Sequence, residues 1–230
     1  MIGVVANTVL VMIGGCIGLL LKKSIPDSLK QITIIGLGLF TCVFGVKMGL
    51  EMQRALVVVA SIVVGGAIGQ VIKIEENIER LANRIKAFVK IQEENTFSQG
   101  FVFASLLFCV GPMTILGCIQ AGIEGNPELL FIKSIMDGVS ALILASTLGI
   151  GVLLSAVTVL FIQGGLVILS QQCQFLTQPL YLNDFTSVGG IIIFAIGIKL
   201  LSVKQLKAGN FLPALVLVVL FTFLVTLINH

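Results

Sequence analysis

Two charged residues, Lys133 and Asp137, lie inside the apolar stretch of the segment 127–148. Their spacing of four puts both side chains on one face of a helix, where an ammonium and a carboxylate can pair. If this helix crosses a membrane, Asp137 lies roughly 15 Å from the helix start, close to mid-depth. A carboxylate at that depth costs about 2.5–3.5 kcal/mol, so a function or a partner is expected for it.

The start of the same segment has the signals of a helix N-terminus. Asn126 suits the N-cap, Pro127 the first helical position, and Glu128 the positive end of the helix dipole. Two kinds of role remain open for Asp137: binding a cation or carrying a proton, or a structural role. In the structural role it pairs with Lys133, or it is protonated and hydrogen-bonded to Ser140 or Gln120.

A proline lies at a similar depth in the preceding apolar segment, residues 100–120. Pro112 has no amide hydrogen to donate, so it leaves the carbonyl of Phe108 unpaired and kinks or breaks the helix. In lipid such a break persists only where protein or water satisfies the freed groups, and Thr114 is close enough to do part of this. The break is either a site of function or a packing kink.

Further polar residues fall inside apolar segments near both ends of the chain. They are Asn7, Gln163, Lys47 and Lys199. The two lysines are interpreted either as anchors that extend to the membrane surface or as matched charges at the two mouths of one pathway.

The composition is that of a membrane protein. Hydrophobic residues form 57% of the 230 residues and charged residues only 11%, whereas a soluble domain has about 25% charged residues. The formal net charge of +3 is too small to indicate nucleic-acid binding. The five cysteines have no CxxC spacing, so they predict neither a zinc site nor a disulfide framework, and no cofactor is indicated.

We predict an all-α fold of about eight transmembrane helices. Their ranges are 2–21, 31–50, 54–72, 100–120, 127–148, 151–169, 186–203 and 210–228. Two interpretations remain open for the segment 127–169, two spans or a re-entrant segment, because only Gly149-Ile150-Gly151 separates its two helices. All basic residues but Lys47, Arg54 and Lys133 lie on one side, which predicts a cytoplasmic location for that side and both termini outside.

The chain also predicts a three-helix inverted repeat. Residues 6–19 and 156–169 are identical at seven of fourteen positions, and five crossings separate the two copies, so the copies run in opposite directions. For the second helix of each repeat the shift between the two copies is two residues longer, and with this shift Lys47 aligns with Lys199. The predicted organisation is a first repeat (1–72), a cytoplasmic amphipathic helix and linker (73–99), a central hairpin (100–148) and a second repeat (151–230).

Two further features bear on packing and partners. An apolar stripe from Ile74 to Phe88 predicts that the helix after residue 73 lies at the cytoplasmic membrane surface. GxxxG patterns begin at Gly14, Gly45 and Gly65, so the first three helices have faces for close packing or for a homodimer.

The chain resembles the domain-of-unknown-function 554 family of bacterial inner-membrane proteins. The stretches that carry the resemblance are GPMTILG at 111–117, GIEGNP at 122–127, KSIMD at 133–137, Asn7, and GGCIG at 14–18. The resemblance implies a location in the inner membrane and coincides with the candidate site. It implies nothing about a solute.

The expected function is that of a small transporter or channel for a small polar or ionic solute, because inverted repeats permit alternating access. The alternative is a scaffold or sensor that transports nothing. No HExxH is present, and no second aspartate is predicted within the membrane, so an enzyme is not expected. The candidate pathway residues are Asp137, Lys133, Pro112, Thr114, Asn126, Glu124, Asn7, Gln163, Lys47 and Lys199.

Overall fold

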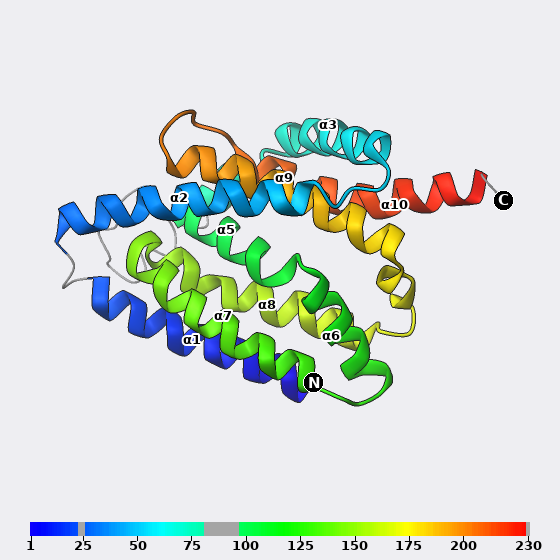
Figure 1. Cartoon of the computed structure of the whole chain (residues 1–230), viewed down its shortest axis with the longest axis horizontal. Helices are drawn as coiled ribbons and strands as arrows, with labels where there is room; N and C mark the ends of the chain where they lie inside the picture. Colours follow the sequence, from blue (N-terminus) through cyan, green and yellow to red (C-terminus); the bar gives the residue numbers. More distant parts are fainter. Residues whose placement is uncertain (23–25, 81–96, 229–230) are drawn as a thin grey trace. The chain divides into compact units, whose positions relative to one another are not determined.

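A computed structural model describes residues 1–22, 26–80 and 97–228, and every regular element in these ranges is a helix (Figure 1). Seven helices are long and apolar enough to cross a membrane. An eighth span is obtained if two helices joined at a 55° bend, Gln99–Cys109 and Pro112–Ile123, are counted together. The predicted all-α fold of about eight transmembrane helices is therefore confirmed.

The α-helices are α1 (Ile2–Lys22), α2 (Asp27–Gly49), α3 (Ala55–Ile72), α5 (Phe97–Cys109), α6 (Pro112–Ile123), α7 (Glu128–Leu148), α8 (Ile150–Ile168), α9 (Pro179–Leu200) and α10 (Pro213–Ile228). Two short 3-10 helices, η1 (Gln174–Thr177) and η2 (Ala208–Phe211), precede α9 and α10. A further helix begins at residue 74 and is described as far as residue 80.

Two helix boundaries, at Gly149 and at Pro179, bear on the predicted spans. Residues 127–169 form two complete helices, because Gly149 ends α7 with φ 79°, a backbone conformation that favours glycine. Helix α9 begins at Pro179, so the predicted start at residue 186 was wrong. The sequence QPLYLND (178–184) lies outside the predicted span, but Pro179 within it is a typical first helical residue.

The helices group into two compact units. Unit 1 contains Met1–Ile34 and Ala82–Thr177, and unit 2 contains Ile35–Leu81 and Gln178–His230. Each unit therefore draws helices from both predicted repeats.

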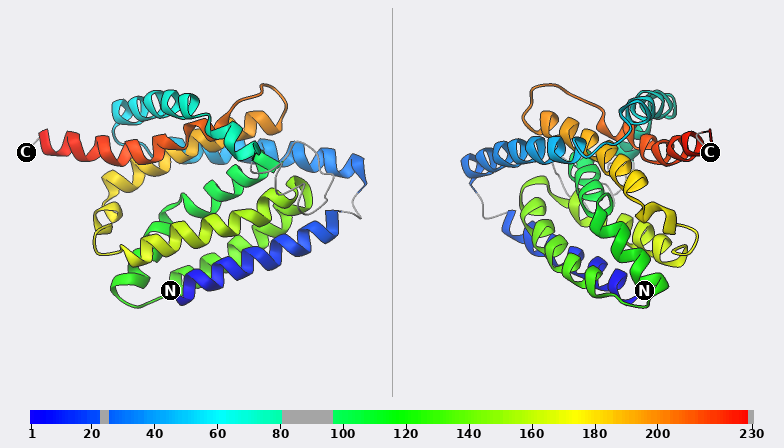
Figure 2. Two further views of the ribbon diagram at one scale, coloured as in Figure 1. Left: turned by 180° about the vertical axis from the view of Figure 1, so that it is seen from behind. Right: turned by 45° about the vertical axis from the view of Figure 1, so that its right-hand side comes forward.

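In unit 1, α1 and α7 lie side by side and run in the same direction (Figures 1 and 2). Gly3 faces Leu130, and Gly14 and Gly18 lie directly against the backbone of α7 at Gly138 and Leu142. A Cβ atom at Gly14 would collide with the carbonyl oxygen of Gly138. The two backbones approach this closely only because the glycines have no side chain.

Helix α8 runs antiparallel to α1 in the same unit. Met1 lies near Gly164, Asn7 is hydrogen-bonded to Gln163, and Gly15 faces Leu153. Helices α1 and α8 are the first pair of the predicted inverted repeat.

In unit 2, α2 and α9 cross at four glycines in a reciprocal pattern. A Cβ atom at Gly45 would lie 2.7 Å from the carbonyl oxygen of Gly190, and one at Gly197 would lie 3.1 Å from that of Gly38. With the same shift that aligns Lys47 with Lys199, the predicted repeat aligns Gly38 with Gly190 and Gly45 with Gly197. Replacing each glycine by its aligned counterpart turns the Gly45–Gly190 contact into the Gly197–Gly38 contact. This is the pattern that a local two-fold axis between the helices produces.

Helix α3 runs antiparallel to η2 and α10, with Gly69 against Asn210 of η2 and Gly65 against Ala214 of α10. All three GxxxG patterns thus use at least one glycine in packing within the chain. The homodimer stays a prediction, but these glycine contacts no longer favour it.

In unit 2, one buried carboxylate accepts hydrogen bonds from the loop before α3, and another accepts one from the loop before α10. Oδ1 of Asp184, on α9, accepts the backbone N–H groups of Gln53 and Arg54 at 2.8 and 3.1 Å. Oε2 of Glu75, which follows α3, accepts the backbone N–H of Gly209 at 2.7 Å. Each carboxylate is itself buried and is partly satisfied by backbone N–H donors of the loop.

Candidate functional site

The charged pair on α7 is a buried ion pair in the middle of the helix. Asp137 is the tenth of its 21 residues, and Nζ of Lys133 lies 2.8 Å from both carboxylate oxygens of Asp137. The two side chains are only 8% and 7% exposed. The i,i+4 spacing that predicted the pair therefore produces it, and the tertiary fold removes it from the surface.

Two neighbouring helices extend this pair into a longer chain of hydrogen bonds. Nδ2 of Asn7, on α1, donates to Oδ2 of Asp137 at 2.9 Å and to Oε1 of Gln163, on α8, at 3.2 Å. Both amides are fully buried. Asn7 and Gln163 were predicted as separate candidates, and the fold brings them into one chain of hydrogen bonds with Asp137.

The chain of hydrogen bonds ends at the break between α5 and α6. The carbonyl oxygen of Phe108 accepts Oγ1 of Thr114 at 3.0 Å and Nε2 of Gln163 at 3.4 Å. This is the carbonyl that Pro112 was predicted to leave unpaired, and Thr114 satisfies it as predicted. The side chains of Asn7, Thr114, Lys133, Asp137 and Gln163, with the Phe108 carbonyl, are called the polar network below.

One acceptor in the polar network has no partner among the described residues. Oδ1 of Asn7 is buried and accepts no hydrogen bond. If the Asn7 amide were rotated so that Oδ1 and Nδ2 changed places, Oδ1 would face the Asp137 carboxylate and repel it. The hydrogen bonds of Nδ2 therefore fix the orientation of the amide. The network has no net charge, because Lys133 neutralises Asp137, yet it retains one free acceptor for a hydrogen-bond donor or a cation.

Two predicted site residues lie away from the polar network, at the turn between α6 and α7. Oδ1 of Asn126 accepts the backbone N–H of Glu128 at 3.0 Å, so Asn126 caps α7 as predicted. Glu124 is exposed and lines an open pocket at the end of α6.

The two lysines of the predicted pathway mouths have different surroundings. Lys47 is exposed near the end of α2, whereas Lys199 is mostly buried and pairs with Oε1 of Glu75 at 2.7 Å. This unequal burial does not favour their interpretation as equivalent mouths.

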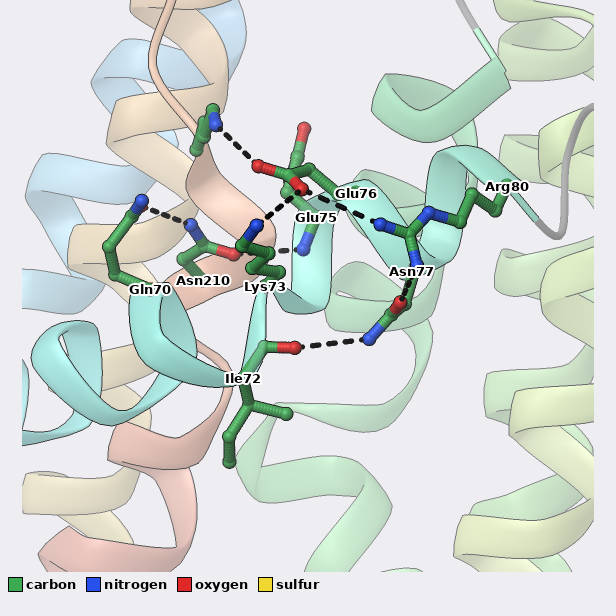
Figure 3. Close-up of polar contacts among 9 residues, drawn as sticks. Gln70, Ile72, Lys73, Glu75, Glu76, Asn77, Arg80 and Asn210 are labelled. Atoms are coloured by element: carbon green, nitrogen blue, oxygen red, sulfur yellow. Dashed lines mark hydrogen bonds and ion pairs between the residues drawn. The ribbon is translucent and has the colours of Figure 1, made fainter.

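Figure 3 shows the surroundings of Glu75, which the sequence analysis had not selected. Its backbone N–H donates to Oδ1 of Asn210, whose Nδ2 donates to Oε1 of Gln70. Together with Lys199 and Gly209, these residues tie the start of the helix at 74–80 to α3 and to the loop before α10.

The predicted amphipathic helix is only partly described, because residues 81–96 lie outside the described ranges. Within its first turns Glu76 is 3.8 Å from Arg80, the predicted i,i+4 pair. A hydrogen bond from Lys207 is the main cause that lowers the pKa of Glu76, and Lys73 and Arg80 add to it. This carboxylate therefore stays ionised at neutral pH.

Asp184 was also missed. No second aspartate was predicted within the membrane. Asp184, however, lies inside the span Pro179–Leu200 and is fully buried. Placing the helix start at Pro179 would have included it. Its backbone contacts give it a structural role in unit 2.

The whole length of the chain matches one protein family. The family described as "Protein of unknown function (DUF554)" has a model that matches residues 2–223. The chain belongs to this family. The resemblance seen in the sequence is confirmed. A membrane protein is supported by the seven long apolar helices, and the inner membrane stays a prediction.

Two curated relatives of similar length share 29% identity with this DUF554 protein. One is the uncharacterised membrane protein YdfK of Bacillus subtilis (strain 168), aligned over 94% of this chain and 93% of its own. The other is the uncharacterised protein YqgA of Escherichia coli (strain K12), aligned over 94% of both chains. No solved structure matches the chain.

Proposed function

We propose that this DUF554 protein is a small transporter or channel for a small polar or ionic solute, and that the solute passes the polar network of unit 1. The observation that carries the proposal is the network itself. Groups from α1, α5, α6, α7 and α8 meet there, around the middle of α7. Polar groups this deep in a membrane are costly and usually mark pathways for ions or solutes.

The broken helix supports the same proposal. Where a span is interrupted, backbone groups at the two half-helix ends become available to a ligand, as in many transporters. Here the break at Gly111-Pro112 is joined to the ion pair through Phe108 and Gln163. A solute that donates a hydrogen bond, or a cation, would meet the free Oδ1 of Asn7 beside them.

We infer alternating access of inverted repeats as the mechanism. The support is that each predicted repeat pair, α1 with α8, α2 with α9 and α3 with α10, packs antiparallel within one unit. The reciprocal glycine contacts of α2 and α9 are those expected of two related copies. We also propose an inner-membrane location with both termini outside.

The experiment that tests the proposal measures flux into proteoliposomes, with stopped-flow light scattering for small polar solutes and an enclosed pH dye for ion gradients. Asp137→Asn removes the charge but leaves Lys133 buried without its partner, at a cost of about 3 kcal/mol in stability. The double variant Lys133→Met/Asp137→Asn avoids this cost because it removes both charges.

We expect flux through the wild type, and a fall of about tenfold or more in the folded double variant, equivalent to about 1.4 kcal/mol in the barrier. Glu128→Gln is the matched control, since Glu128 is an exposed acid on the same helix, and its flux should equal that of the wild type. Unchanged flux in the double variant would contradict a pathway through the polar network. No flux in the wild type would favour the scaffold or sensor.

A further inference from the structure

An open pocket of about 410 Å³ lies at the end of α6 in unit 1. One face of α6 forms a wall of it, through Leu116, Gln120, Ile123 and Glu124. Gln174 and Thr177 of η1 also line the pocket. The lining therefore combines an apolar wall with a carboxylate, two amides and a hydroxyl, the mixture that small-molecule sites commonly have.

Glu124 is the charged residue that lines the pocket, and no basic side chain of the described residues lines it. Between residues 97 and 177 the only basic residue is Lys133, which is already paired with Asp137. Glu124 has no basic residue to balance it within that range. The C-terminal end of α6, at Ile123, adds the negative end of its dipole on the same side.

We propose that this pocket binds a small organic cation, with its ammonium group at Glu124 and its apolar part against Leu116 and Ile123. Hydrogen-bonding groups of the ligand would meet Gln120, Gln174 and Thr177. An anion is disfavoured by the carboxylate of Glu124, and a purely apolar ligand would leave the polar groups without partners.

The pocket also has a direct structural relation to the polar network. Helix α6 contributes Thr114 to the network and Gln120 to the pocket, and six residues of helix separate them by about 9 Å. Only this step rests on the proposed transport function: if a solute passes the polar network, the pocket is its entrance. The transported solute would then be a small organic cation.

Binding is tested on the purified full-length protein with a tryptophan reporter. The chain has no tryptophan, so Ile123→Trp, at a partly exposed position in the pocket, gives a single fluorescent reporter. The probe is benzyltrimethylammonium, and benzenesulfonate of similar size serves as its anionic counterpart. We expect a saturable fluorescence change with the ammonium and none with the sulfonate.

Glu124→Gln in the reporter background should weaken ammonium binding about fivefold, as expected for loss of a partly exposed ion pair. Glu128→Gln removes a nearby acid that does not line the pocket and should leave the affinity unchanged. A thermal shift of the protein without the reporter checks that the tryptophan does not create the site.

Equal binding of the two probes, or equal affinity in wild type and Glu124→Gln, would overturn the inference. These results are independent of the flux assay. Transport through the polar network without cation binding in the pocket would refute the pocket alone, and binding without an effect of the double variant on flux would refute the pathway alone.

Discussion

The carbonyl oxygen of Phe108 connects the helix break with the rest of the polar network. Pro112 cannot donate to it, so the oxygen depends on two side chains, Thr114 and Gln163. The hydrogen bond from Thr114 is the shorter of the two, at 3.0 Å against 3.4 Å. Thr114 is therefore the residue whose loss should affect the break most.

Thr114→Val keeps the shape of the side chain and removes its hydroxyl. We expect a loss of about 1–2 kcal/mol in stability, because the buried carbonyl keeps only the longer bond. Thr8→Val is the matched control, since Oγ1 of Thr8 bonds the carbonyl of Val4 within a regular helix and its loss should cost less than about 0.5 kcal/mol. Unfolding of both variants in detergent measures the difference, and equal losses would contradict a special role for Thr114.

At the scale of helices, glycine contacts decide which elements meet. The sequence alignment of the repeat pairs Gly14 with Gly164, but the structure gives these two positions different surroundings. Gly14 lies against the backbone of α7, whereas a Cβ atom at Gly164 would meet only the flexible end of Met1, at 3.8 Å.

Alanine at each of these positions tests this difference. Gly14→Ala should destabilise unit 1 by about 1–3 kcal/mol, because its methyl group would force α1 and α7 apart. Gly164→Ala should have no unfavourable effect. Thermal unfolding midpoints of the two variants decide the matter, and a Gly164→Ala variant as unstable as Gly14→Ala would show that these contacts are wrong.

At the scale of the whole molecule, the distribution of basic residues predicts which side of the membrane each loop occupies. Glu124 follows the fourth span and Lys207 the seventh, so three crossings separate them and they should face opposite sides. Both side chains are exposed in the structure.

Cysteines at these two positions, in a protein without its five native cysteines, make the prediction measurable. A maleimide that does not cross membranes should label Glu124→Cys in intact cells, and Lys207→Cys only after permeabilisation. The reverse pattern would invert the orientation but keep eight spans. Labelling of both from one side would contradict the count of spans and, with it, the inverted repeat.

The membrane fold, the broken span and the Lys133–Asp137 pair all follow from the sequence alone. Insertion in lipid depends on the apolar length of each segment, and a proline break or an i,i+4 pair depends only on neighbours along the chain. These are local quantities, so Pro112, Thr114 and the charged pair were found where the structure has them.

The hydrogen bonds that link Asn7 and Gln163 to Asp137, and the burial of Glu75 and Asp184, are set by the tertiary fold. Asn7 lies 130 residues from Asp137 and 156 from Gln163 along the chain. A helix in lipid is apolar on nearly all sides, so its sequence does not mark which side faces another helix. Contacts between helices are set by small residues and shape complementarity, which become visible only when the backbones are placed together.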